Sequence, residues 1–141
     1  MTSPSPAERD VLLSAFSKAL FARDVAAVYR TVTPDFCWQL PIGPDAPTAR
    51  EIKSGEQLAA YFDERERMYD GVRFHDVVYH HAPDATFMTF RVTARRKDGG
   101  ANVDAHGMER YLFRDGRIAL KDVYRKPAPA TASAATITVT M

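Results

Sequence analysis

The stretch that decides the fold is Val103–Arg125, which reads VDAHGMERYLFRDGRIALKDVYR. Runs of β-branched and aromatic residues flank Asp115-Gly116, a dipeptide that accepts the positive φ angles of a tight hairpin turn. The pattern therefore predicts two antiparallel strands. Because side chains alternate between the two faces of a strand, Glu109 shares a face with the aromatic Tyr111. A carboxylate on an apolar face is the feature that any functional hypothesis has to explain.

The register of this hairpin determines which residue lies beside Glu109, because a slip of one residue exchanges the faces. A two-residue turn places Tyr111 opposite Leu120 and Glu109 opposite Asp122, so that two carboxylates share a site. A three-residue loop with a glycine bulge instead places Glu109 opposite Lys121 and creates an ion pair. The matching of apolar residues favours the two-residue turn, and the sequence leaves both registers open.

The composition limits the classes of protein to consider. At 141 residues the chain is long enough for one domain with its own hydrophobic core. Its 19 Lys and Arg residues against 18 Asp and Glu residues give a net charge of +1, which argues against nucleic acid or an anionic membrane as a partner. The single cysteine, Cys37, cannot form an internal disulfide, and no secretion signal or apolar span of roughly 20 residues is recognisable. We therefore expect a cytoplasmic protein.

The other elements are predicted from helical or alternating spacing of apolar residues, from N-cap residues, and from prolines and glycines that end elements. Together they predict an α+β fold with helices packed on one face of a curved, mixed or antiparallel sheet. We expect one domain over residues 1–127 and an Ala/Ser/Thr-rich tail over 128–141 that is mobile or adds an edge strand. The predicted elements before the hairpin are helices over 8–21, 25–32 and from 54 towards 69, and strands over 36–40, 72–80 and 86–96.

Four segments together resemble the nuclear transport factor 2-like superfamily, in its SnoaL-like and ketosteroid isomerase-like branch. They are residues 16–24 leading to Tyr29, then 40–43, 54–58 and 109–118, within a likeness that extends over residues 8–126. The resemblance implies a cystatin-like fold in which helices cover the concave face of a cone-shaped sheet. It also implies an apolar pocket at the open end of the cone. The matching segments are features of the scaffold, so they predict the fold and not one activity.

The resemblance also distinguishes between activities when it is carried over residue by residue. Phe16 stands where ketosteroid isomerases keep a hydrogen-bonding tyrosine, and Leu40 stands where they keep their general base, so that reaction is disfavoured. Glu109 matches the aspartate that SnoaL-like polyketide cyclases use as acid or base. The residues that would line the implied substrate pocket are Phe16, Tyr29, Trp38, Leu40, Tyr61, Phe62, Phe90 and Tyr111.

Acid/base chemistry at Glu109 also follows from the residues themselves. Burial disfavours the charged carboxylate and raises its pKa, a neighbouring Asp122 would raise it further, and a neighbouring Lys121 would keep the group ionised. We expect a small lipophilic ligand and, in an enzyme, cofactor-free isomerisation or cyclisation of a ketone with Glu109 and Asp122 as catalytic residues. A tyrosine would donate a hydrogen bond to the enolate. The expected assembly is a homodimer through the outer face of the sheet.

Other hypotheses stand beside this one. The same pocket could belong to a non-catalytic binding module, and Arg91, Glu109 and Asp122 loosely imitate the Asp-Arg-Asp arrangement of epoxide hydrolases in this superfamily. A purely structural Glu109 would form a salt bridge with Arg91 or Arg110. The four histidines fit no metal-ligand template, so no metal is expected, and Arg65 is expected on a solvated helix face.

Overall fold

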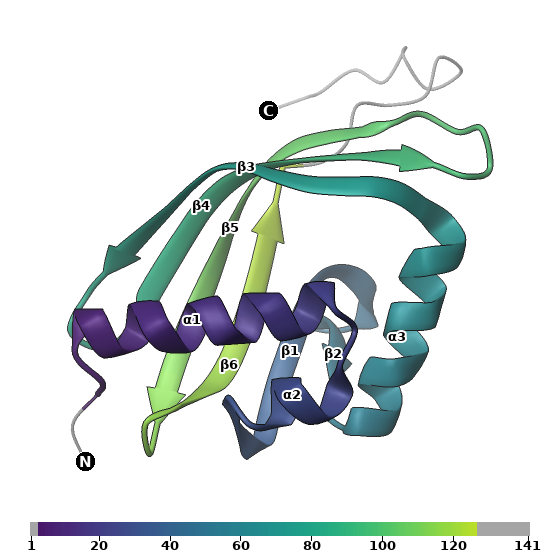
Figure 1. Cartoon of the computed structure of the whole chain (residues 1–141). Helices are drawn as coiled ribbons and strands as arrows, with labels where there is room; N and C mark the ends of the chain where they lie inside the picture. Colours follow the sequence, from purple (N-terminus) through teal and green to yellow (C-terminus); the bar gives the residue numbers. More distant parts are fainter. Residues whose placement is uncertain (1–2, 127–141) are drawn as a thin grey trace.

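In a computed structural model, which describes residues 3–126, a strongly curved sheet wraps around the helices (Figure 1). The predicted tail at 128–141 lies outside the described residues. The elements in chain order are α1 (Pro6–Phe21), α2 (Val25–Tyr29), β1 (Val32–Asp45), β2 (Ala49–Ile52), α3 (Gly55–Met68), β3 (Tyr69–His81), β4 (Thr86–Arg96), β5 (Val103–Arg114) and β6 (Arg117–Arg125).

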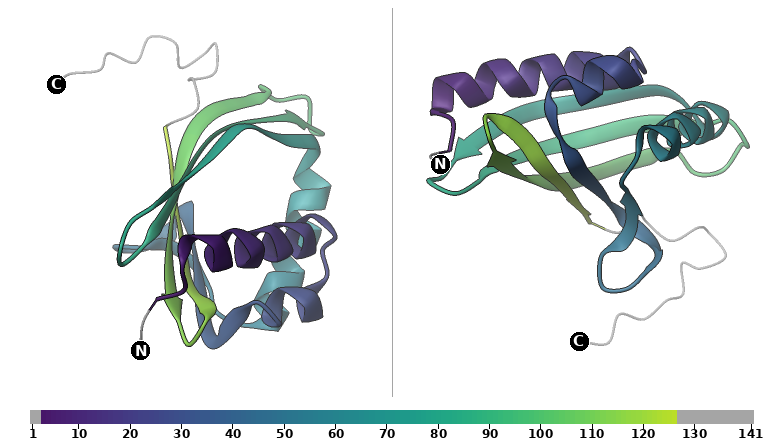
Figure 2. Two further views of the ribbon diagram at one scale, coloured as in Figure 1. Left: turned by 60° about the vertical axis from the view of Figure 1, so that its left-hand side comes forward. Right: turned by 90° about the horizontal axis from the view of Figure 1, so that it is seen from below.

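The sheet has the strand order β2-β1-β6-β5-β4-β3. The four strands from β3 to β6 form an antiparallel meander, as their hairpin signals predict, and β1 joins it by pairing in parallel with β6. The sheet is therefore mixed. Both views in Figure 2 show that its long strands curve around α1, which lies on the concave side. The predicted α+β class and the curved sheet are confirmed.

The helices begin where the sequence places their N-caps. Ser5 and Glu8 form a reciprocal capping box at α1, Asp24 accepts a hydrogen bond from the amide of Ala27 at 3.0 Å, and Ser54 accepts one from the amide of Gln57 at 3.1 Å. The helix ends differ from the prediction. Helix α2 stops at Tyr29 and α3 at Met68, because the residues that follow each helix pair with neighbouring strands.

The segment predicted as a short strand over 36–40 is much longer in the structure, where β1 runs from Val32 to Asp45 and pairs with an unpredicted β2. Prolines within β1 had indicated an end to the strand. Pro34 lies in the register shift between β1 and β6, and Pro41 and Pro44 lie in the shift between β1 and β2. Proline has no N–H to donate, so it is tolerated where the ladder is interrupted.

Phe16 of α1 anchors the core on the concave face. It packs edge-to-face against Phe36 of β1 and Tyr111 of β5, with ring centroids 5.9 and 6.1 Å apart. Aromatic pairs in this geometry add to the stabilisation that their buried area provides. The core inside the cone is thus formed by one helix, α1, and two strands, β1 and β5.

Arg9 fastens the beginning of α1 to the β3–β4 turn. It is 3% exposed, and its guanidinium donates to the backbone oxygens of Ala82, Pro83 and Ala85 at 2.7 to 3.1 Å. It also lies over the ring of Phe113, 5.0 Å from the centroid. No pattern in the sequence indicates this clamp, since these acceptors are backbone groups more than 70 residues away. Within residues 3–126, no helix is both long and apolar enough to cross a membrane.

Candidate active site: a buried Glu109–Lys121 ion pair

Glu109 lies on the concave face of β5 and is 2% exposed. The hydroxyl of Tyr111 donates a hydrogen bond to its Oε1, and Lys121 Nζ of β6 lies 3.1 Å from the same oxygen. Within residues 3–126, no hydrogen bond reaches the other carboxylate oxygen, Oε2. The interior of the cone therefore holds a carboxylate with one saturated oxygen and one oxygen free to accept a proton.

Aromatic rings surround the ammonium of Lys121. Its Nζ lies 4.6 Å from the centroid of the Trp38 ring, 5.4 Å from that of Phe16 and 5.8 Å from that of Tyr111. A ring face attracts a cation, and this attraction strengthens where water is excluded. The lysine is 6% exposed, so the carboxylate and the rings together compensate for the lost hydration of its charge.

A bulge in β6 brings Lys121 to this position. At the turn, Phe113 pairs with Ile118, as a two-residue turn requires, but the next pair is Leu112 with Leu120. One extra residue in β6 shifts the register from there on. As a result Tyr111 lies opposite Lys121, and Glu109 lies opposite Val123. The two-residue turn is confirmed, and the pairs that it predicted beyond the turn are wrong.

Asp122 does not join the carboxylate of Glu109. It follows Lys121 in β6, so its side chain points to the outer face, where the guanidinium of Arg110 donates to it at 3.2 Å. The predicted pair of carboxylates is therefore replaced by a Glu–Lys pair inside and an Asp–Arg pair outside. The physical reason is the bulge, which exchanges the faces of Lys121 and Asp122. Arg91 also lies outside, bonded to Asp104 at 2.8 Å, so the epoxide hydrolase-like trio does not converge.

The protonation states follow from burial and charge. Burial lowers the pKa of Lys121, and the charge of Glu109 opposes that shift. Burial raises the pKa of Tyr111 well above its usual value, and the negative charge of Glu109 adds to the increase. Tyr111 therefore stays a neutral hydrogen-bond donor over the physiological range. The arrangement offers a proton acceptor, a cation and a hydroxyl donor within one aromatic enclosure.

The other residues predicted to line the pocket differ in how deeply they are buried. Tyr61 of α3 is half-buried and contacts the ring of Trp38 edge-to-face, with centroids 5.1 Å apart. Phe90 of β4 lies farther along the sheet and packs against Phe74 at 5.0 Å. Tyr29 on α2 is half-buried and packs against the core. The buried members of the predicted set are Phe16, Trp38, Leu40, Phe62, Phe90 and Tyr111.

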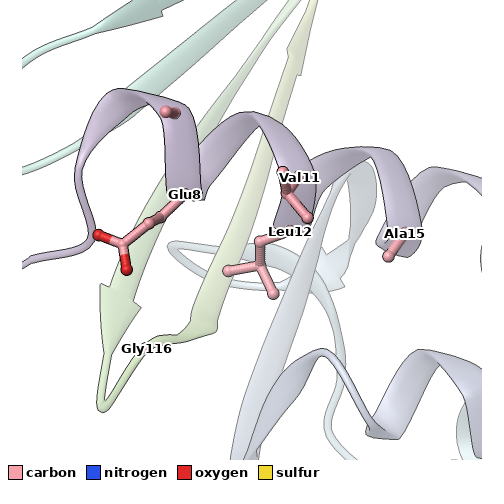
Figure 3. Close-up of a pocket in the computed structure, with 6 residues that line it drawn as sticks. Glu8, Val11, Leu12, Ala15 and Gly116 are labelled. Atoms are coloured by element: carbon pink, nitrogen blue, oxygen red, sulfur yellow. The ribbon is translucent and has the colours of Figure 1, made fainter.

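A hollow between α1 and the β5–β6 turn is lined by none of these residues. Figure 3 shows Glu8, Val11, Leu12 and Ala15 of α1 at its edge, together with Gly116 of the hairpin turn. A second hollow lies between α1 and α2, along Ala19 and neighbouring residues. Neither is lined by a residue of the predicted pocket. The apolar pocket inside the cone stays a prediction.

Histidine and cysteine side chains lie outside this centre. His75 bonds Thr93 at 2.7 Å, and His81 lies 2.8 Å from Asp10. Among the described residues, no three His, Cys, Asp or Glu side chains converge as metal ligands would. Burial and the neighbouring Glu51 raise the pKa of Cys37 to about 12, which keeps its thiol protonated.

Sequence reasoning left one feature of the site open and did not predict another. Lys121 was one of two open partners for Glu109, and no local signal marks the bulge that selects it. Arg65 is partly exposed on α3, and its guanidinium lies over the Tyr61 ring, 5.8 Å from the centroid. The i, i+4 spacing of these residues on α3 was the only signal for that contact.

Several solved structures have the same fold as this chain. An NTF2-like protein from Burkholderia xenovorans LB400 is 15% identical, with a TM-score of 0.72 over 86% of this chain and 92% of that one. A candidate polyketide cyclase from Xanthomonas campestris is 16% identical, with a TM-score of 0.66 over 84% and 90%. A protein with a ketosteroid isomerase-like fold from Catenulispora acidiphila, in complex with trimethylamine, is 13% identical, with a TM-score of 0.62 over 89% and 91%.

At these identities the structures establish a shared fold and no shared activity. A comparison with curated protein sequences finds no match. The family model of the SnoaL-like domain matches residues 13–121, which include the C-terminal half of α1, the three aromatic rings around the ammonium and both members of the buried ion pair. This chain belongs to the SnoaL-like domain family and has the NTF2-like fold.

Proposed function

We propose that this protein binds a small lipophilic carbonyl compound inside the cone and that Glu109 removes a proton from the carbon next to the carbonyl group. The observation that carries the proposal is the Glu109–Lys121 ion pair within a wall of aromatic rings. A carboxylate can accept a proton and so act as a base. The rings supply an apolar surface for the ligand.

The proposed reaction uses groups already in place. Oε2 of Glu109 takes the proton, and the electrons of the broken C–H bond form an enolate on the ligand. Lys121 lies beside Glu109 and can stabilise the negative enolate oxygen by its charge and by hydrogen bonding, while the hydroxyl of Tyr111 holds the carboxylate in place. Return of the proton at another carbon isomerises the ligand, and attack of the enolate carbon on a second carbonyl carbon cyclises it. Neither outcome needs a cofactor.

The polyketide cyclase description of the Xanthomonas structure supports a ligand of this class, because cyclisation of a polyketide joins carbons through an enolate. Phe16 and Leu40 are both buried and apolar in this chain. They cannot supply the hydroxyl donor and the base that the ketosteroid isomerase reaction requires. The proposed mechanism therefore depends on Glu109 as the single base.

Proton exchange tests this proposal directly. 2-Tetralone has acidic protons next to its carbonyl, and in D₂O their loss can be followed by proton NMR. We expect the wild-type protein to accelerate the exchange and Glu109→Gln to abolish the acceleration. Asp104→Asn is the matched control, because it removes a carboxylate of the same strand, β5, that is exposed and paired with Arg91 on the outer face. Equal exchange by wild type and Glu109→Gln would refute catalysis at Glu109.

A non-catalytic binding module is the second candidate. The observation that favours it is the saturation of Glu109 Oε1 by both Tyr111 and Lys121, an arrangement that also suits a purely structural pair. In that case 2-tetralone would bind, as shown by perturbed NMR signals, and would not exchange faster than in buffer. The same experiment therefore separates the two candidates.

A further inference from the structure

Trp38 carries a buried hydrogen-bond donor without an acceptor. Its side chain is 4% exposed, and within residues 3–126 its indole Nε1 has no hydrogen-bond partner. Leaving such a group unpaired is unfavourable, and native proteins seldom tolerate it without a reason. Trp38 lies between Lys121 and Tyr61, so the unpaired N–H belongs to the wall of the proposed ligand site.

Three arginines gather around Tyr61. The guanidiniums of Arg50 and Arg65 lie 5.3 and 5.8 Å from its ring centroid. Arg125 is the last residue of β6, and strand alternation puts it on the same side as Lys121 and Val123. We call Arg50, Tyr61, Arg65 and Arg125 the cationic mouth.

The charges of the cationic mouth do not balance. Arg50 is paired with Glu64 at 2.8 Å, and Lys121 is paired with Glu109. Arg65 and Arg125 form no ion pair with any residue of the described part of the chain. Two positive charges are thus left beside the aromatic enclosure, in a protein whose net charge is only +1.

The positive charges of Arg65 and Arg125 affect the pKa values of Lys121 and Tyr61. Burial lowers the pKa of Lys121, and the charges of Arg65 and Arg125 lower it further against the opposing effect of Glu109. Burial raises the pKa of Tyr61, and the same two arginines oppose that increase. Both guanidiniums are therefore close enough to influence a charge that enters the site. Apart from Glu109 Oε2, the unpaired groups of this region are the two guanidiniums and the indole N–H of Trp38, and an acceptor with negative charge complements all three.

We propose that the cationic mouth selects a lipophilic acid, whose carboxylate lies between Arg65 and Arg125 and whose apolar body lies against Trp38 and Tyr61. An acceptor atom of the ligand takes the hydrogen bond of Trp38 Nε1. Arginine suits this task because its planar fork can hold a carboxylate with two parallel hydrogen bonds. The inference rests on the proposed function in one respect, the ligand site inside the cone, and it adds the charge of the ligand.

A matched pair of probes tests the inference. 4-Phenylbutyrate and 4-phenylbutyramide have nearly the same shape and differ in charge. Binding can be measured by calorimetry and by the fluorescence of Trp38, the only tryptophan of the chain. We expect the acid to bind at least about tenfold more tightly than the amide. Raising NaCl from about 50 to about 500 mM should weaken binding of the acid and leave binding of the amide unchanged.

Variants identify the groups responsible. Arg65→Gln and Arg125→Gln should each weaken binding of the acid, and the double variant should bind acid and amide equally. Arg117→Gln is the matched control, because it removes an exposed charge at the hairpin turn, and it should bind like the wild type. Trp38→Phe keeps a ring but lacks the N–H, so it should weaken binding of the acid as well.

Equal binding of acid and amide by the wild type would overturn the inference, as would failure of the acid to bind at all or an equal loss in Arg117→Gln. The result is independent of catalysis. Preference for the acid with no Glu109-dependent exchange of 2-tetralone would retain this inference and refute the proposed base. Glu109-dependent exchange without preference for the acid would retain the proposed base and refute this inference.

Discussion

Lys121 Nζ lies 3.1 Å from Glu109 Oε1 although the two residues are not opposite each other in the sheet. Lys121 faces Tyr111, and Glu109 faces Val123, so the ion pair is diagonal across β5 and β6. Side chains at diagonal positions can meet when they are long, as lysine and glutamate are. The contact fixes the two strands to each other at the centre of the cone.

Breaking this pair should destabilise the protein more than removing it. Glu109→Gln leaves a buried ammonium without its carboxylate, and we expect a loss of about 3–5 kcal/mol in the free energy of unfolding. The double variant Glu109→Leu/Lys121→Met buries no charge and should recover most of that loss. Urea denaturation measures both. A loss below about 1 kcal/mol for the single variant would contradict a dry interior.

Stability should respond to alkaline pH in two opposite ways. The pKa of Lys121 is lowered from 10.5 in the folded protein, so between the two values the unfolded chain binds one more proton and stability rises with pH. The pKa of Tyr111 is raised from 10.0, so above that value the unfolded chain loses a proton first and stability falls.

The increase of stability with pH that Lys121 causes should be absent in Lys121→Met. Urea midpoints of the wild type and this variant at about pH 8 and about pH 10 measure the difference. The urea midpoint of the wild type should increase relative to that of the variant as the pH increases. A constant difference would show that the pKa of Lys121 is the same in the folded and unfolded states.

Arg9 should be irreplaceable by lysine. An ammonium has three donors and no fork, so Arg9→Lys leaves some of the acceptors at Ala82, Pro83 and Ala85 unsatisfied. We expect a loss of about 2–3 kcal/mol, measured by thermal or urea unfolding. Arg117→Lys, at an exposed position, should cost nothing measurable. An equal effect of the two substitutions would contradict the clamp.

Gly107 should tolerate no side chain while Phe90 is present. A Cβ at position 107 would lie 2.5 Å from Phe90 Cζ and 3.0 Å from the backbone oxygen of Tyr124. Gly107→Ala should therefore cost about 1–3 kcal/mol in urea denaturation. Adding Phe90→Leu should restore part of that loss, because it removes the closer clash. No restoration would place the strain in the contact with Tyr124.

The homodimer stays a prediction, and the outer face of the sheet offers a surface for it. Val78, Thr89, Met108 and Tyr124 lie side by side across four strands, and Val78 and Tyr124 are 49% and 53% exposed. We propose that a second copy covers this row. Light scattering after gel filtration should give the mass of a dimer for the wild type and of a monomer for Tyr124→Lys. A monomeric wild type would refute the proposed homodimer.

Local patterns predicted the hairpin, the meander, the helix starts and the position of Glu109 on an apolar face. They did not predict β2 or the full length of β1, because the prolines in β1 indicate chain breaks unless the pairing partners are known. They also did not predict the contact of the Arg65 guanidinium with the Tyr61 ring, because helical spacing alone does not show which ring a side chain contacts.

By itself, the sequence determined that a carboxylate enters the interior of a curved sheet, since alternation along a strand is a property of its own residues. Only the tertiary structure decided that Lys121 accompanies Glu109 and that Asp122 faces outward. That choice depends on one extra residue in β6, a strand that pairs with β5 on one side and with β1 on the other. No local pattern contains that constraint.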